Sequence, residues 1–298
     1  MSSTAFAPAT VRSPRAPLLA NPRALARQLL LYLGVSAVVG TVCFPLFWMV
    51  SGSFKPRAEL YAYPPTFLPQ TWTLENYQTL LGQTEFLTYF ANSLIVAFGA
   101  TGLALLFGTM GAYSLTRFRF AGLRLIAQSS LFCYMLPEAL LVIPLYMFVV
   151  NVGLADTLYS LILSNTAFTL PLTLWFMRSY FAAIPPTLEE SAMIDGCTRF
   201  QAFYRVTLPL ALPGVVSVGV FGFNHAWNEF LFALVFTSSE RNKVLPIGLA
   251  TWIGQDSVFS WGMLLAAAVL ITLPVVLFYL LVQRHLVSGL AAGGVKGE

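Results

Sequence analysis

Long apolar stretches separated by short polar segments dominate the pattern along the chain. Six stretches are long enough to cross a membrane, and they cover residues 29–51, 90–115, 125–150, 158–176, 208–236 and 259–282. A helix rises about 1.5 Å per residue, so roughly 20 residues span a hydrocarbon core about 30 Å thick. The pattern therefore predicts an all-α integral membrane protein whose six transmembrane helices form one domain over residues 29–283.

The composition agrees with a membrane protein and leaves no room for a separate soluble catalytic domain. Hydrophobic residues make up 57% of the 298 residues and charged residues only 9%, whereas about a quarter of a soluble domain is charged. Cys43, Cys133 and Cys197 show no paired spacing. We expect them to be free thiols, and we expect no metal site.

The basic residues predict the orientation of the chain. When the N-terminus is placed inside, most of the 16 lysines and arginines fall on the inner side, as the positive-inside rule favours. Both termini are therefore predicted to be cytoplasmic, and so is the polar segment 177–207. The first 28 residues read as a disordered basic tail, and residues 284–298 form a second cytoplasmic tail.

A polar island between the fourth and fifth apolar stretches, residues 185–209, has the local chemistry of two short helices around a turn. The spacing of Thr187 and Glu190 predicts a capping box at the first helix. Gly196 suits the left-handed end of that helix. The spacing of Thr198 and Gln201 predicts a second capping box.

The residues of the second short helix form an expected stripe. Phe200, Phe203, Tyr204 and Thr207 fall on one face at helical spacing, and Pro209 is expected to open the next span. A purely structural role remains open for this island, with Glu190 as a cap and Asp195 as a solvated carboxylate.

The spacing across the whole island resembles the signature loop of the membrane subunits of binding-protein-dependent ABC importers. Glu190-Ser191-Ala192 is followed by Asp195-Gly196 and, after nine residues, by Val206-Thr207-Leu208-Pro209. The resemblance implies the type I importer permease fold. It also implies contact with an ATPase through Glu190, Ser191, Ala192, Asp195, Gly196, Leu208 and Pro209.

Other segments resemble the carbohydrate branch of the same family. Ser53-Phe54-Lys55-Pro56, Ile143-Pro144-Leu145-Tyr146 and Ala226-Trp227-Asn228-Glu229-Phe230 are similar to segments of that branch. The C-terminal Gly-rich end is similar to the tail of maltose-type second membrane subunits, where it would lie between the ATPase subunits. The residues implied in that contact are Gly293, Gly294, Val295, Lys296 and Gly297, although such a tail is also typical of a flexible end.

The outer loop 237–257 is long for a connection between neighbouring helices. It resembles the loop that, in maltose-type second subunits, reaches into the sugar cleft of a docked binding protein.

The resemblance implies a division of labour among several subunits. The sequence contains no G-x-x-x-x-G-K-[ST] phosphate loop, so this chain is expected to bind no cofactor and a partner ATPase is expected to use ATP and Mg. The expected partners are a homologous second permease, an ATPase dimer, an extracytoplasmic binding protein and membrane lipid, with no nucleic acid. The expected location is the bacterial or archaeal cytoplasmic membrane.

Polar residues inside the predicted spans are candidates for a translocation path, because charged groups in a bilayer are costly unless they face partners or a cavity. Asn224, His225, Asn228 and Glu229 share one helical face of the fifth span, and Glu138 follows Pro137 in the third. An internal pairing of His225 with Glu229 and contact with a sugar are both open interpretations.

Two other functions are weighed against an importer subunit that carries a sugar or sugar-like solute. An ion-coupled transporter or channel could use Glu138, His225 and Glu229 as a proton relay, but it leaves the signature loop unexplained. A membrane-embedded enzyme is disfavoured, because the chain has 2 histidines and neither H-E-x-x-H nor G-x-S-x-G. The sequence does not identify the sugar.

Overall fold

The structure is a computed structural model that describes residues 22–119, 121–254 and 261–294. Within these ranges the chain is helical and contains no strand, which confirms the predicted all-α class. Four helices are long and apolar enough to cross a membrane alone, and the number rises to six if each of two bent helix pairs forms one span. The single helices are α1 (Pro22–Ser53), α4 (Phe86–Arg117), α7 (Leu158–Ala183) and α14 (Trp261–Gly294).

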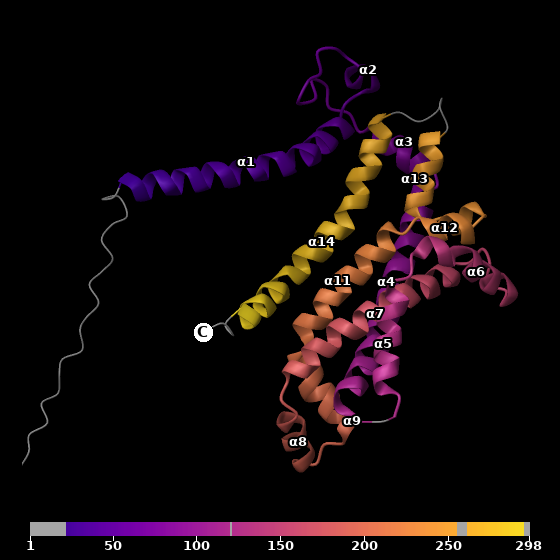
Figure 1. The fold of residues 1–298 in the computed structure, drawn as a ribbon. Coiled ribbons are helices and arrows are strands. Elements are labelled where there is room, and N and C mark those ends of the chain that lie inside the picture. The colour runs from indigo at the N-terminus through magenta and orange to yellow at the C-terminus, as the bar shows by residue number, and fades with distance from the viewer. Residues whose placement is uncertain (1–21, 120, 255–260, 295–298) are drawn as a thin grey trace, which may run out of the picture.

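The centre of the bundle is formed by α4, α7 and α11 (Leu212–Asn228), which lie against one another (Figure 1). Their contact surfaces use small residues, because small side chains let helix backbones approach closely. A Cβ added at Gly108 of α4 would lie 2.4 Å from Thr173 Cγ2 of α7. Similarly, a Cβ at Gly222 of α11 would lie 3.0 Å from Thr169 Cγ2. Glycine at these positions allows the three helices to pack.

Helix α1 extends away from this bundle (Figure 1). It contacts α14, whereas apolar side chains along its length, such as Leu30 and Tyr32, are 70% exposed. The apolar surface of α1 must therefore be covered by lipid or by another protein.

The third predicted span, 125–150, is not one continuous helix. It consists of α5 (Leu123–Tyr134) and α6 (Glu138–Asn151), which meet at an angle of 104°. Pro137 occupies the position just before α6. Proline has no N–H to donate and disfavours helical geometry in the residue before it, so the helix stops there.

The fifth predicted span, 208–236, is also wrong as a single helix. It divides into α10 (Leu208–Leu210), α11 and α12 (Leu231–Phe236), and the segment before Ala211 is bent by 75° from α11. Pro209 therefore opens a short helix, whereas Pro213 lies in the first turn of α11. The fourth span is longer than the predicted 158–176, because α7 continues to Ala183.

Short helices complete the two ends of the bundle. The end opposite the signature loop carries α2 (Arg57–Leu60), α3 (Glu75–Gln83), the 3-10 turn η3 (Glu240–Asn242) and α13 (Leu245–Gly254). The signature loop carries α8 (Thr187–Ile194), α9 (Arg199–Ala202) and the π-helix η2 (Phe203–Thr207). Figure 1 shows α8 and α9 at one tip of the molecule and α2 and α3 at the other.

Candidate functional site

The signature loop folds as two short helices around a glycine turn, as its sequence predicts. Gly196 has a φ of 94°, in the left-handed region that glycine adopts without steric cost. The backbone N–H of Cys197 donates to Ala192 O at 3.0 Å, and the N–H of Gly196 donates to Met193 O at 3.1 Å. These two bonds close the end of α8 and direct the chain into α9.

Only one of the two predicted capping boxes forms. At α9, Gln201 N donates to Thr198 Oγ1 at 3.3 Å and Thr198 N donates to Gln201 Oε1 at 2.8 Å. The box predicted from Thr187 and Glu190 is wrong, because Pro186 takes the cap position and Thr187 is already helical. The carboxylate of Glu190 consequently makes no capping bond and is exposed.

The predicted stripe of Phe200, Phe203, Tyr204 and Thr207 is split between two environments. Phe203 and Thr207 are buried, whereas Phe200 and Tyr204 are 68% and 64% exposed. Helical spacing puts Phe203 and Thr207 on one edge of this stripe and Phe200 and Tyr204 on the other, and the bundle covers only the first edge. Phe203 packs on Tyr113 of α4, with ring centroids 4.5 Å apart.

Glu189 connects the signature loop to the bundle. The sequence pattern did not single out this buried carboxylate. The Glu189 side chain accepts from Arg117 Nε at 2.7 Å, from Thr207 Oγ1 at 2.7 Å and from the Tyr113 hydroxyl at 2.9 Å. Glu189 is only 5% exposed. Arg117 also donates through Nη2 to Ile184 O at 2.8 Å. We call Glu189, Arg117, Tyr113 and Thr207 the anchor cluster.

The anchor cluster favours the ionised form of Glu189. Burial by itself opposes ionisation, but the hydrogen bonds from Arg117, Thr207 and Tyr113 and the charge of Arg117 outweigh it and lower the pKa of Glu189 below its usual value. The only sequence signal for this residue is a pair of adjacent acids, Glu189 and Glu190. Adjacent helical residues lie about 100° apart, so the sequence does not say which of the two faces inward.

The residues predicted to contact an ATPase lie mainly on the outer surface of the loop. Glu190, Ser191, Asp195, Gly196 and Pro209 are exposed, and Ala192 and Leu208 are partly buried. Ile194, on the same short helix, is 86% exposed. The anchor cluster thus holds α8 from its inner side while acidic, small and apolar groups face outward.

The candidate path residues of the fifth span separate into two groups. Asn224 and Asn228 are exposed on α11, and Asn228 Nδ2 donates to Asn224 O at 2.8 Å. Glu229 follows the end of α11, is 8% exposed, and accepts from Phe232 N at 2.6 Å and from Ala233 N at 3.1 Å. The predicted shared face of all four residues is therefore wrong for Glu229, which caps α12.

The partner of His225 is Glu138 rather than Glu229. His225 Nε2 of α11 lies 3.6 Å from Glu138 Oε1, at the first turn of α6. The break at Pro137 makes this possible, because it places the start of α6 beside α11. His225, Glu138 and Asn224 line a cavity of about 240 Å³, together with Tyr134 and Thr169.

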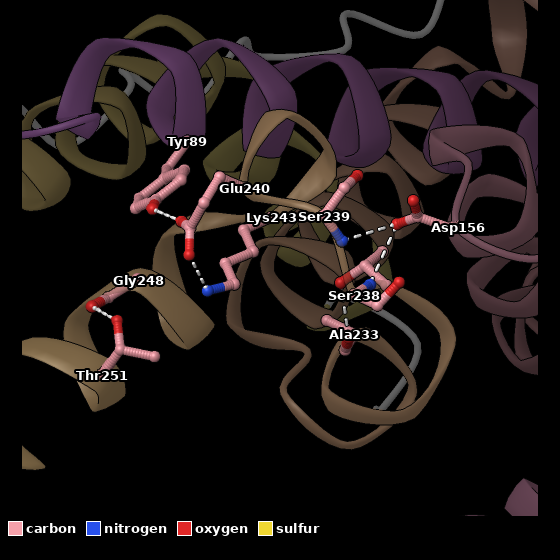
Figure 2. Close-up of polar contacts among 10 residues, drawn as sticks. Tyr89, Asp156, Ala233, Ser238, Ser239, Glu240, Lys243, Gly248 and Thr251 are labelled. Carbon is pink, nitrogen blue, oxygen red and sulfur yellow. Dashed lines mark hydrogen bonds and ion pairs between the residues drawn. The ribbon is translucent and has the colours of Figure 1, made fainter.

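The outer loop after α12 is held against the bundle by side chains from several elements. Figure 2 shows that the Glu240 carboxylate accepts from the Tyr89 hydroxyl of α4 and from Lys243 Nζ. Asn92 Nδ2 of α4 donates to Arg241 O and to Lys243 O, both at 2.8 Å. These bonds fix the position of η3 over the end of α4.

Asp156 fixes the start of the same loop. Its Oδ1 accepts from Ser238 N at 2.9 Å and from Ser239 N at 3.0 Å, as Figure 2 shows. The hydrogen bond from the Ser238 backbone is the main cause that lowers the pKa of Asp156 from 3.8 to about 2. The described part of loop 237–257, which ends at Gly254, is therefore a folded element that includes α13, and residues 255–257 lie outside the described residues.

The predicted C-terminal contact is only partly within the described residues. Gly293 and Gly294 are the last residues of α14. Val295, Lys296 and Gly297 lie outside the described residues, so the predicted contact of this tail stays a prediction.

Comparison with known proteins identifies relatives along most of the chain. A family model described as "Binding-protein-dependent transport system inner membrane component" matches residues 104–291. The inner membrane ABC transporter permease protein YcjP of Escherichia coli (strain K12) is 41% identical, over 93% of this chain and 99% of YcjP. The trehalose/maltose transport system permease protein MalG of Thermococcus litoralis is 37% identical, over 91% of this chain and 98% of MalG.

Similarity to a solved structure supports the fold. A crystal structure of a bacterial ABC transporter that imports the acidic polysaccharide alginate contains a chain with a TM-score of 0.77. The match covers 89% of this chain and 98% of that one at 22% identity. The likeness shows that the two chains share a fold.

Proposed function

This chain belongs to the family of binding-protein-dependent transport system inner membrane components, and we propose that it is the permease subunit of an ATP-driven importer for a sugar or sugar-like solute. In this role it forms half of a path across the cytoplasmic membrane. The name of the MalG relative, which refers to trehalose and maltose, supports the solute class.

The anchored signature loop is the observation that carries the coupling part of the proposal. Glu190, Ser191, Asp195 and Gly196 are exposed at one tip of the molecule, whereas Glu189 is bonded to the end of α4. A force applied to the outer surface of α8 would therefore be passed to a central helix of the bundle. Rigid-body movement of this kind is a known way to alternate access across a membrane.

The energy for such movement is expected to come from a partner. The sequence has no phosphate loop, so a separate ATPase dimer would bind ATP and Mg and dock at the loop. The remaining partners are a homologous second permease and an extracytoplasmic binding protein. The folded outer loop, held by Asp156 and Glu240, would offer the binding protein a defined surface.

The exposed polar residues of α11 support a path along this face of the chain. Asn224 and Asn228 are exposed, and the side chains of His225 and Glu138 are 34% and 38% exposed. Such groups are costly against lipid and normally face a bundle interior or water. We place the second permease and the path at this face. The apolar α1 would meet lipid or the second permease.

Co-purification tests the proposal directly. The chain is co-expressed with the ATPase, permease and binding protein of its own importer and purified through a tag on this chain. ATPase activity is then measured with and without loaded binding protein. An ATPase that co-purifies and is stimulated by loaded binding protein is the expected result. Solute uptake driven by an ion gradient in the chain alone, with no ATPase bound, would instead support an ion-coupled transporter that uses the Glu138 and His225 pair.

A further inference from the structure

The cavity between α5, α6, α7 and α11 combines polar groups with aromatic walls. Its volume is about 240 Å³. Polar atoms come from Glu138, Thr169, Asn224 and His225. Rings of Tyr134, Phe168 and Phe221 also line it. Groups from four helices thus meet at the bend between α5 and α6. A continuous third span would not have brought these groups together.

Two buried polar atoms at this cavity have no hydrogen-bond partner among the described residues. Thr169 is 5% exposed, and its hydroxyl makes no bond within the described part of the chain. His225 Nε2 is also without a hydrogen bond there, because its distance of 3.6 Å to Glu138 Oε1 exceeds the usual hydrogen-bond range. Buried polar groups are nearly always paired, so each of these two atoms is free to bond a polar group of a ligand that fills the cavity.

We propose that this cavity binds one ring of a neutral sugar during its passage through the membrane. The inference rests on the proposed function and adds a site to it. It assigns direct contact with the solute to this subunit, through Thr169, Glu138, His225 and Asn224.

The chemistry of the lining favours a neutral, hydroxyl-rich ligand. A sugar hydroxyl both donates and accepts, and the cavity offers a carboxylate that accepts, an amide and a hydroxyl that do both, and an imidazole. The rings of Phe168 and Phe221 can pack against the C–H face of a sugar. The carboxylate of Glu138 disfavours an anionic ligand. A cavity of about 240 Å³ is below the roughly 300–1,000 Å³ of sites for drug-sized molecules, so one ring is the fitting unit.

A metal ion is a poorer occupant of the same cavity. Among the described residues no group of three or more histidine, cysteine, aspartate or glutamate side chains could hold one. Glu138 and His225 alone offer two ligands, fewer than the four or more that protein-bound metals usually take.

Transport by the complete importer in proteoliposomes tests the site. The vesicles contain this chain with its co-expressed permease and ATPase, and loaded binding protein is supplied with radiolabelled trehalose or maltose. Thr169→Val keeps the shape of the side chain and removes the unpaired hydroxyl. We expect the sugar moved per ATP hydrolysed to fall about three- to ten-fold, the equivalent of one net hydrogen bond. Stimulation of the ATPase by loaded binding protein should persist.

Thr101→Val is the matched control. Thr101 lies on α4, is 7% exposed, and its hydroxyl also has no partner among the described residues, but it does not line this cavity. The ratio of sugar to ATP should stay at the wild-type value. Equal behaviour of the two variants would overturn the site and leave the importer function standing. A wild-type chain that binds no ATPase would overturn the proposed function itself.

A second measurement decides the question if Thr169→Val fails to assemble. Asn224→Cys is introduced into a chain in which Cys43, Cys133 and Cys197 are replaced by serine, and the rate of labelling by a small thiol reagent is measured in the assembled importer. Labelling should be several-fold slower with trehalose or maltose present than with sulfate present, because the cavity disfavours an anion. Labelling that neither sugar slows would contradict the proposal. Uptake that stops when the proton gradient is collapsed, with ATP present, would instead assign Glu138 and His225 to a proton relay.

Discussion

Arg117 and Glu189 form an ion pair with an Nε to Oε1 distance of 2.7 Å that joins the end of a central helix to the signature loop. Their side chains are only 8% and 6% exposed. The pair is therefore shielded from water, unlike an exposed surface pair, which contributes little. Through this pair, a displacement of α8 would be passed directly to α4.

Because of this pair, replacing Glu189 should lower the stability of the chain far more than replacing the adjacent Glu190. Glu189→Ala leaves Arg117 without its carboxylate, so we expect the free energy of unfolding to fall by roughly 3–5 kcal/mol. Glu190→Ala removes an exposed side chain and should change it by less than about 0.5 kcal/mol. Thermal unfolding of both variants in the same detergent measures the difference. Equal stabilities would show that the ion pair contributes nothing.

The outer loop should be sensitive to acid through Asp156. Its pKa is lowered from 3.8 to about 2 in the folded chain, so ionised Asp156 stabilises the loop fully above about pH 4. This contribution is lost as the pH falls from about 4 toward 2. Limited proteolysis between Ser238 and Gly254 should accelerate over this interval in the wild type.

Asp156→Asn provides the comparison for the outer loop. The Asp156→Asn chain should be cleaved fast above about pH 4 as well, because an amide is a weaker acceptor for the N–H groups of Ser238 and Ser239. Asp195→Asn, an exposed aspartate in the signature loop, should behave as the wild type. A cleavage rate that does not change with pH in the wild type would contradict this role.

The packing of α4 on α7 gives a prediction from two glycines of the same helix. Gly108→Ala would place a Cβ 2.4 Å from Thr173 Cγ2 and should destabilise the fold by about 1–3 kcal/mol. Gly102→Ala meets no atom within 4 Å and should stabilise α4 by about 0.5–1 kcal/mol through helix propensity. Chemical unfolding of the two variants should move the midpoint in opposite directions. A shift in the same direction would refute the close approach at Gly108.

The glycine turn of the signature loop should be required for docking. Gly196 has a φ of 94°, which proline cannot adopt because its ring holds φ near about −65°. Gly196→Pro should therefore abolish co-purification of the ATPase while the chain still inserts into the membrane. Gly82→Ala on the outer helix α3 has open space around it and should leave co-purification unchanged. Normal co-purification of the ATPase with the Gly196→Pro chain would show that this loop is not the site of coupling.

The class of the protein and the local chemistry of the signature loop follow from the amino-acid sequence. Apolar length is enough to identify a membrane helix, since backbone groups in lipid must be satisfied within the helix. A glycine at a left-handed turn and the capping box at Thr198 depend on neighbours a few residues away, so both were predictable. Features that depend on contacts between near neighbours in the sequence can be predicted from short segments.

Which polar groups face one another depends instead on how the helices pack in three dimensions. Glu189 turned inward because Arg117, which precedes it by 72 residues, lies beside α8. His225 met Glu138 because the chain breaks at Pro137 by 104°, whereas Glu229 turned away where α11 ended. Helical spacing places side chains on a face, but it contains no information about the angle between two helices or the element that covers the face. These long-range relations created the anchor cluster and the polar cavity.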